Sequence, residues 1–131
     1  MKKYRMLIEH SEYYMQAARD VRNETALVML QLSSATAHLI EGEQENALKR
    51  LRETIRILRG SGITMPAVEY CIHDPDLFRF GRDHMPEHRS FFENVLTAAK
   101  PLRKNIEALR SYELTDIAEL SSASENSLAE E

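Results

Sequence analysis

Apolar or small residues recur every third or fourth position from Tyr4 to Leu39. The series is Tyr4, Leu7, Ser11, Tyr14, Ala18, Val21, Thr25, Val28, Leu32, Ala35 and Leu39. This alternating spacing puts every member on one stripe of a helix. We therefore expect one long N-terminal helix of about 54 Å, at about 1.5 Å of rise per residue. The alternative is a break near Asn23, whose side chain could cap a second helix.

Gly42 is expected to end this helix, because glycine is common just past a helix C-terminus. A second helix then follows at once and closes at the "GSG" of residues 60–62. Its predicted buried stripe is Ala47, Leu48, Leu51, Ile55 and Leu58. So short a turn forces the two helices into an antiparallel hairpin.

Residues 60–85 show little long-range period and form a connection that is long for a compact domain. Within it, Asp74 can cap a small helical turn that has Pro75 at its first position and ends at Gly81. Pro66 can open another short helix, with a strand as the alternative. We expect a helical connector.

A last long helix is predicted from about Pro86, with a kink at Pro101. Its stripe is Phe92, Val95, Ala99, Leu102, Ile106 and Leu109. The expected fold is all-α: a helical bundle built on a long N-terminal helix, an antiparallel helical hairpin, a helical connector and a long kinked C-terminal helix.

The chain has 131 residues, which suits a single helical-bundle domain over residues 1–120. Residues 121–131 read "SSASENSLAEE", and we expect an acidic, Ser-rich flexible tail there. The formal net charge is -4, and residues 114–131 hold five acidic and no basic residues. The net charge argues against a general nucleic-acid binder, although the rest of the chain is close to neutral without this acidic segment.

The sequence carries one cysteine and no apolar run that approaches the ~18 residues of a membrane span. A lone cysteine agrees with a reducing compartment. The sequence also lacks a glycine-rich phosphate loop. We expect a cytoplasmic protein with no membrane contact and no cofactor.

The stretch from 71 to 88 gathers residue types that bind zinc. The candidate ligands are Cys71, His73, His84 and His88. Sparse His and Cys clusters in helical proteins are more often caps and hydrogen-bonding loop residues. We therefore expect a polar connector without a metal, and keep a structural zinc site as the alternative.

Arg79-x4-His84, and Arg82 followed by His88, resemble the R-x4–6-H motif of HEPN-type ribonucleases. That resemblance implies a helical, dimeric ribonuclease in which Arg82 and His88 form the catalytic pair. From the residues themselves we expect instead that Arg79 and Arg82 pair with nearby aspartates at the surface. The prediction is a protein that is not an enzyme, with this nuclease as an alternative.

The hairpin around Gly42 resembles one tetratricopeptide repeat. Ala35, Gly42, Ala47 and Leu51 fall where such repeats place small and apolar residues. The resemblance covers a single unit, whereas a solenoid needs about three. It implies a tight helical hairpin and no more.

Basic residues recur at helical spacing opposite the apolar face of the second helix. They are Lys49, Arg52, Arg56 and Arg59, and Lys100, Arg103 and Arg110 repeat the pattern on the last helix. A basic stripe can bind phosphates, so a nucleic-acid-binding regulator is an alternative function. A solvated face is the preferred interpretation.

The expected function is a small helical protein-interaction module of the adaptor, chaperone or inhibitor type. It would bury a helix face against a protein partner or against a second copy. The long first helix exceeds what the second helix can cover, so we expect a homodimer there. The predicted contact residues are Leu7, Tyr14, Val21 and Val28.

Overall fold

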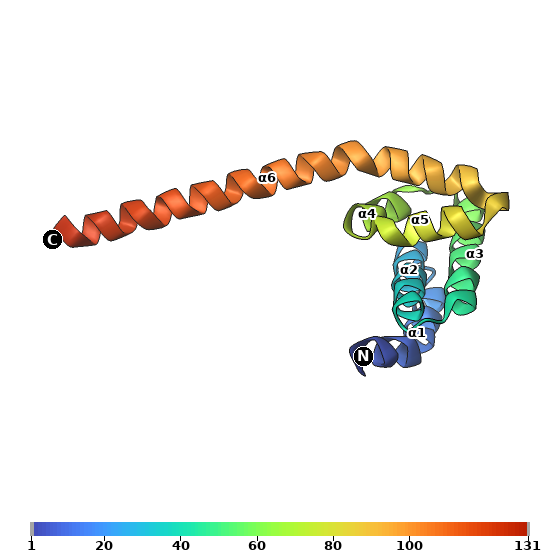
Figure 1. Ribbon diagram of the computed structural model, residues 1–131. Coiled ribbons are helices and arrows are strands. Elements are labelled where there is room, and N and C mark those ends of the chain that lie inside the picture. The colour runs from blue at the N-terminus through green and yellow to red at the C-terminus, as the bar shows by residue number, and fades with distance from the viewer. Residues whose placement is uncertain (1, 131) are drawn as a thin grey trace. The chain divides into compact units, whose positions relative to one another are not determined.

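The computed structural model describes the backbone of residues 2–130 and the side chains of residues 4–111. The described part is helical and contains no strand, so the predicted all-α fold is confirmed (Figure 1). Its elements are α1 (Lys2–Asp20), α2 (Glu24–Ile40), α3 (Gln44–Ser61), α4 (Met65–His73), α5 (Pro75–His84), the 3-10 helix η1 (Pro86–His88) and α6 (Arg89–Glu130). The chain divides into two units, Met1–Ala99 and Lys100–Glu131.

The expected unbroken N-terminal helix is wrong, and the alternative break at Asn23 is confirmed. Helix α1 ends at Asp20, and Arg22 adopts a left-handed φ of 56° that no helix can continue through. Asn23 then caps α2, because its Oδ1 accepts the backbone N–H of Ala26 at 3.0 Å.

The break leaves the hydrophobic spacing in phase, which is why periodicity alone did not locate it. Helices α1 and α2 form a hairpin in which the start of α1 lies beside the end of α2, where Arg5 pairs with Glu43 at 2.5 Å. Met15 of α1 and Leu32 of α2 are both 0 % exposed. The stripe of one expected helix is therefore divided between two helices. Ser11 and Ala18 of α1 and Val28 of α2 are buried, whereas Leu7 and Tyr14 stay exposed.

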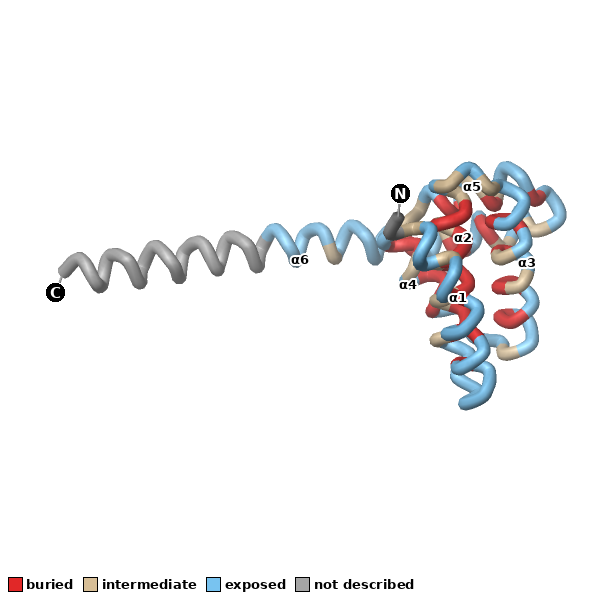
Figure 2. The backbone as a smooth tube through the Cα atoms, turned by 90° about the horizontal axis from the view of Figure 1, so that it is seen from below, coloured by how far each residue is buried: buried red, intermediate tan, exposed pale blue. Residues whose placement is uncertain are grey.

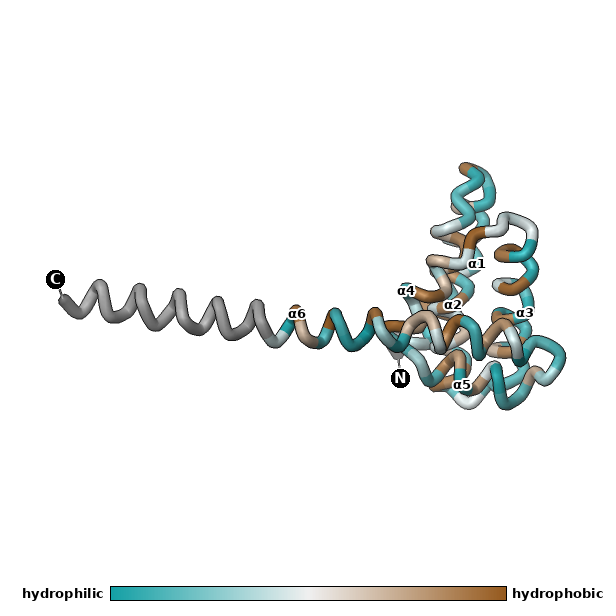
Figure 3. Tube along the Cα trace, turned by 90° about the horizontal axis from the view of Figure 1, so that it is seen from above, coloured by the Kyte–Doolittle hydropathy of each residue, from teal (hydrophilic) through white to brown (hydrophobic). Residues whose placement is uncertain are grey.

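Helix α2 is the centre of the first unit, because it contacts α1, α3, α4 and α5. Gly42 and Gly62 have φ values of 80° and 71°, and they end α2 and α3 as the sequence predicts. The predicted stripe of α3 is buried throughout: Ala47, Leu48, Leu51, Ile55 and Leu58. Buried residues lie on the faces that α1, α2 and α3 turn toward one another (Figure 2), and the hydrophobic side of α3 faces α2 (Figure 3).

The connector forms two helices, α4 and α5, and Asp74 lies at the junction as the predicted N-cap of α5. Its Oδ1 accepts the N–H of Leu77 at 3.4 Å, and its Oδ2 accepts the Thr36 hydroxyl of α2 at 2.9 Å. The prediction that Gly81 ends the turn is wrong, because α5 continues to His84. Gly81 is instead a buried contact point within the helix.

Helix α6 supplies the last core residues of the first unit. Phe92, Val95 and Ala99 are buried, whereas Leu102 and Leu109 are 38 % and 62 % exposed. Pro101 lies inside this helix, as expected. The predicted flexible tail, 121–131, lies outside the residues whose side chains the structure describes, so it stays a prediction.

Candidate functional site

A shallow apolar groove of about 420 Å³ lies between α1 and α2. Its lining is Met6, Leu7, His10, Ser11, Tyr14, Leu30 and Ser33. Met6 is 56 % exposed and Tyr14 is 55 % exposed, which is high for residues of this size. The groove is therefore an apolar surface open to solvent.

The groove residues repeat at helical spacing along both walls. On α1, Met6, His10 and Tyr14 are four residues apart, and on α2 Leu30 and Ser33 are three apart. Two neighbouring helices with such rows leave a channel into which the side-chain ridge of a third helix can pack. The geometry suits an apolar helical ligand better than a small polar one.

At the floor of the groove, the Ser11 hydroxyl already has a hydrogen-bond partner. Ser11 is 3 % exposed, and its hydroxyl donates to the Ile8 carbonyl of the preceding turn at 2.8 Å. An apolar ligand that covers Ser11 would therefore strand no hydrogen-bonding group there.

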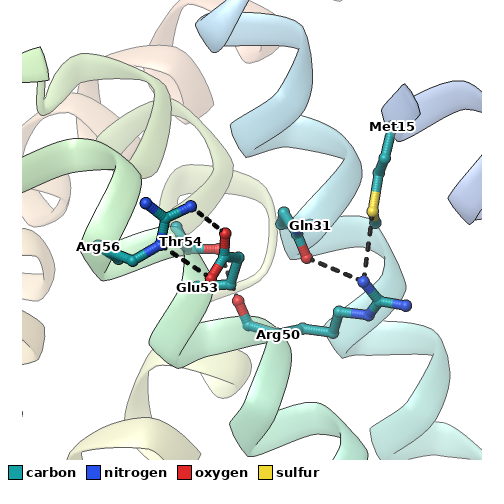
Figure 4. Close-up of polar contacts among 6 residues, drawn as sticks. All are labelled: Met15, Gln31, Arg50, Glu53, Thr54 and Arg56. Carbon is teal, nitrogen blue, oxygen red and sulfur yellow. Dashed lines mark hydrogen bonds and ion pairs between the residues drawn. The ribbon is translucent and has the colours of Figure 1, made fainter. Parts of the chain in front are cut away.

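Arg50 of α3 holds α1 in place behind the groove. Its guanidinium pairs with Glu12 of α1 at 2.6 Å and donates to Gln31 Oε1 of α2 at 3.4 Å. Figure 4 shows the same group reaching Met15 Sδ, also at 3.4 Å. With a side chain 18 % exposed, Arg50 connects three helices. We did not predict this role, although Arg50 follows Ala47 by three residues and so borders the buried stripe of α3.

A second polar group, His38, lies in the core at the end of α2 and is 6 % exposed. Burial lowers the pKa of His38, and the nearby charges of Arg50 and Arg5 lower it further, against an opposing effect of Glu43. His38 Nδ1 lies 3.6 Å from Glu43 Oε2, the carboxylate that also holds Arg5 of α1. A neutral His38 therefore belongs to the packing that positions α1.

The structure exposes three of the four predicted contact residues. Leu7 and Tyr14 line the groove, and Val21 is 74 % exposed in the turn after α1. The inclusion of Val28 is wrong, because α2 buries it to 1 % exposure. The hairpin also brings Met6, His10 and Leu30 to the groove, which the helical spacing does not predict. An unbroken helix could not have placed Leu30 beside α1.

The four candidate zinc ligands are not brought together. Cys71 is buried in α4 and His73 is exposed. The ring of His84 stacks on Phe80 and its Nδ1 bonds the Phe80 carbonyl, while His88 lies beside Arg59. Within the described residues, no group of three or more His, Cys, Asp or Glu is placed to hold a metal ion.

The arginines of the ribonuclease-like motif make the surface pairs expected of them. Arg79 pairs with Asp76 at 2.7 Å and Arg82 with Asp83 at 3.1 Å. His88 lies instead 3.4 Å from Arg59 of α3. Arg82 and His88 thus have different side-chain partners within one chain. The dimeric ribonuclease that the resemblance implies stays an alternative prediction.

The basic stripe is on the surface of α3, since Lys49, Arg52, Arg56 and Arg59 are all exposed. Arg56 donates to Glu53, and this hydrogen bond lowers the pKa of that carboxyl. With Arg59 beside His88, half of the stripe already has a side-chain partner. This favours a solvated face over a phosphate-binding strip.

The chain was compared with protein-family models, with curated proteins and with solved structures, and none of them matches it. Among the described residues, no helix is both long enough and apolar enough to cross a membrane.

Proposed function

We propose that this protein is a cytoplasmic interaction module of the adaptor, chaperone or inhibitor type, which binds an amphipathic helix of a partner protein in the α1–α2 groove. The observation that carries the proposal is the exposure of Met6, Leu7 and Tyr14 around one apolar hollow. Exposed apolar patches that are bordered by polar residues commonly mark contact surfaces.

The shape of the groove supports a helical ligand. A helix presents apolar side chains at every third or fourth position, which matches the repeat of both walls. Leu and Phe side chains of such a ligand would cover Leu7 and Tyr14, while its polar face stayed in water. The Arg50 contacts to Glu12 and Gln31 fix the wall that α1 contributes, so the groove is preformed.

Site-specific photo-crosslinking tests the proposal in living cells. A benzoylphenylalanine at Tyr14 lies in the groove, and one at Glu45 lies on the exposed first turn of α3. We expect the Tyr14 probe to capture a partner and the crosslinked peptide to map to an amphipathic helix.

The Glu45 probe is the control for collisions at the surface. Equal capture at the two positions would contradict the proposal. So would crosslinks from Tyr14 that map to polar loops, because a polar loop would leave the apolar side chains of Met6, Leu7 and Leu30 uncovered.

A further inference from the structure

The second unit, Lys100–Glu131, carries a separation of charge that the groove does not explain. Residues 100–112 contain four basic residues and one acidic residue. Residues 113–131 contain six acidic residues and no basic one. Helix α6 runs to Glu130, so one helix is basic in its first half and acidic in its second half.

The same segment has an exposed apolar row. Leu102 is 38 % exposed, Ile106 is partly exposed, and Leu109 is 62 % exposed. Figure 2 shows the described part of α6 beyond the first unit as mostly exposed. In the sequence, Ile117 and Leu120 continue this row at helical spacing. Such a row is stable in water when another helix covers it.

We propose that Lys100–Glu131 pairs antiparallel with the same segment of a second copy of this chain. Antiparallel pairing sets the basic half of each helix beside the acidic half of the other, within a Debye length of about 8–10 Å. Parallel pairing would set like charges side by side along the whole segment. The charge pattern therefore favours a second copy of the same segment as the partner, and it favours the antiparallel orientation over the parallel one.

The apolar row agrees with a twofold axis near position 111. Leu102 and Leu120 lie nine residues before and after that position, so each would meet the other on the opposite copy. The midpoint between Ile106 and Ile117 in the sequence falls within one residue of the same position. This register sets Leu102 opposite Leu120 and Arg103 opposite Glu119, and it brings Ile106 close to Ile117.

Disulfide crosslinking of full-length chains tests the direction. Leu102→Cys and Leu120→Cys are prepared separately and then mixed under mild oxidation; the native Cys71 is 1 % exposed and stays protected. We expect a Leu102→Cys to Leu120→Cys heterodimer in the mixture and little crosslinking of either variant alone. Self-crosslinking of each variant alone would show a parallel pair and overturn the proposal.

Charge reversal tests the driving force by sedimentation. Arg103→Glu with Lys104→Glu reverses two of the four basic charges of the segment. We expect about tenfold weaker dimerisation or more, since four charges change sign per dimer. Asp116→Lys with Glu119→Lys reverses two of the six acidic charges of residues 113–131 and should weaken self-association similarly. Mixing the two variants should restore a dimer.

The matched control is Lys49→Glu with Arg52→Glu, which reverses two exposed charges on α3 and should leave dimerisation unchanged. A monomeric wild-type chain at high micromolar concentration would overturn the proposal, as would a control that weakens the dimer equally. The inference is independent of the groove: Leu7→Asp should abolish partner crosslinking from the groove and leave this dimer intact.

Discussion

Gly81 of α5 lies directly against the ring of Phe92 in α6. A β-carbon built on Gly81 would lie 2.4 Å from Cε1 and Cζ of Phe92, closer than such atoms approach in proteins. Phe92 is 0 % exposed and also packs edge-on against Phe78, so its ring has little room to move. The absence of a side chain at Gly81 is what allows α5 and the start of α6 to pack.

Gly81→Ala should therefore lower stability, although alanine normally favours a helix over glycine by about 1 kcal/mol. Overpacking of a filled core costs about 1–3 kcal/mol, and we expect it to exceed the helix-propensity gain. Urea denaturation followed by circular dichroism measures the change in the free energy of unfolding.

Gly60→Ala is the matched control, because Gly60 is also helical and a β-carbon there would contact nothing within 4 Å. It should stabilise the protein by about 0.5–1 kcal/mol. Equal stabilisation by both substitutions would show that the Phe92 ring can move aside.

Arg50→Ala should loosen α1. The change removes the ion pair with Glu12 and leaves Gln31, which is 0 % exposed, without its bond from the guanidinium. Losing a charge-assisted hydrogen bond to a buried group costs about 1–3 kcal/mol. Hydrogen exchange should show faster amide exchange in α1 than in α3, and Arg52→Ala, an exposed change on the same helix, should shift stability by about 0.5 kcal/mol at most.

His38 should make stability depend on pH. Its folded-state pKa is lowered, first by burial and then by Arg50 and Arg5, so the unfolded chain binds a proton more readily. The stabilisation is complete above the usual pKa of 6.5 and is lost as the pH falls below that value toward the folded-state pKa. Thermal melts between pH 7.5 and 5 should show this decline.

His38→Gln should flatten the decline, because the buried titrating group is gone. His73→Gln, a change at an exposed histidine, is the control and should preserve the wild-type profile. An unchanged slope in His38→Gln would assign the pH dependence to other groups.

The sequence predicts the helices of this fold well where short-range chemistry decides them. Gly42, Gly62 and Asp74 end or begin helices through backbone conformation and capping, which are local effects. The break at Arg22 was not favoured, because a three-residue turn preserves the three-and-four spacing on both sides. The spacing of apolar residues indicates which residues are buried, and not whether the helix is broken. Leu32 is buried in the hairpin and would also be buried in one long helix.

The candidate site depends on contacts that spacing cannot supply. Tyr14 and Leu7 are exposed, as a contact surface requires, because they lie at the edge of the α1 stripe. Val28 lies on a face that the hairpin buries. Leu30 joins the groove only because α2 folds back along α1. Gly81 was taken as a helix end for a similar reason, since nothing local shows that Phe92 fills the space beside it.

Tyr14→Ala should weaken helix binding in the groove while leaving the fold intact. Tyr14 lines the groove, and its neighbour Tyr13, 74 % exposed, lies outside the lining. The two rings touch edge-on, so Tyr13→Ala removes a similar aromatic area and the same ring contact without changing the groove wall. The probe is a synthetic amphipathic helical peptide with leucines at i, i+4 and i+7, titrated into labelled protein and followed by amide chemical shifts.

In the wild type, shifts should concentrate at Met6, Leu7 and His10. Truncating a buried aromatic contact at an interface costs about 2 kcal/mol or more, so Tyr14→Ala should weaken peptide binding by about thirtyfold. Tyr13→Ala should bind nearly as the wild type does, and both variants should melt within a few degrees of it, because both side chains are exposed. Equal losses in the two variants, or shifts centred on α3, would show that the α1–α2 groove is not where a helix binds.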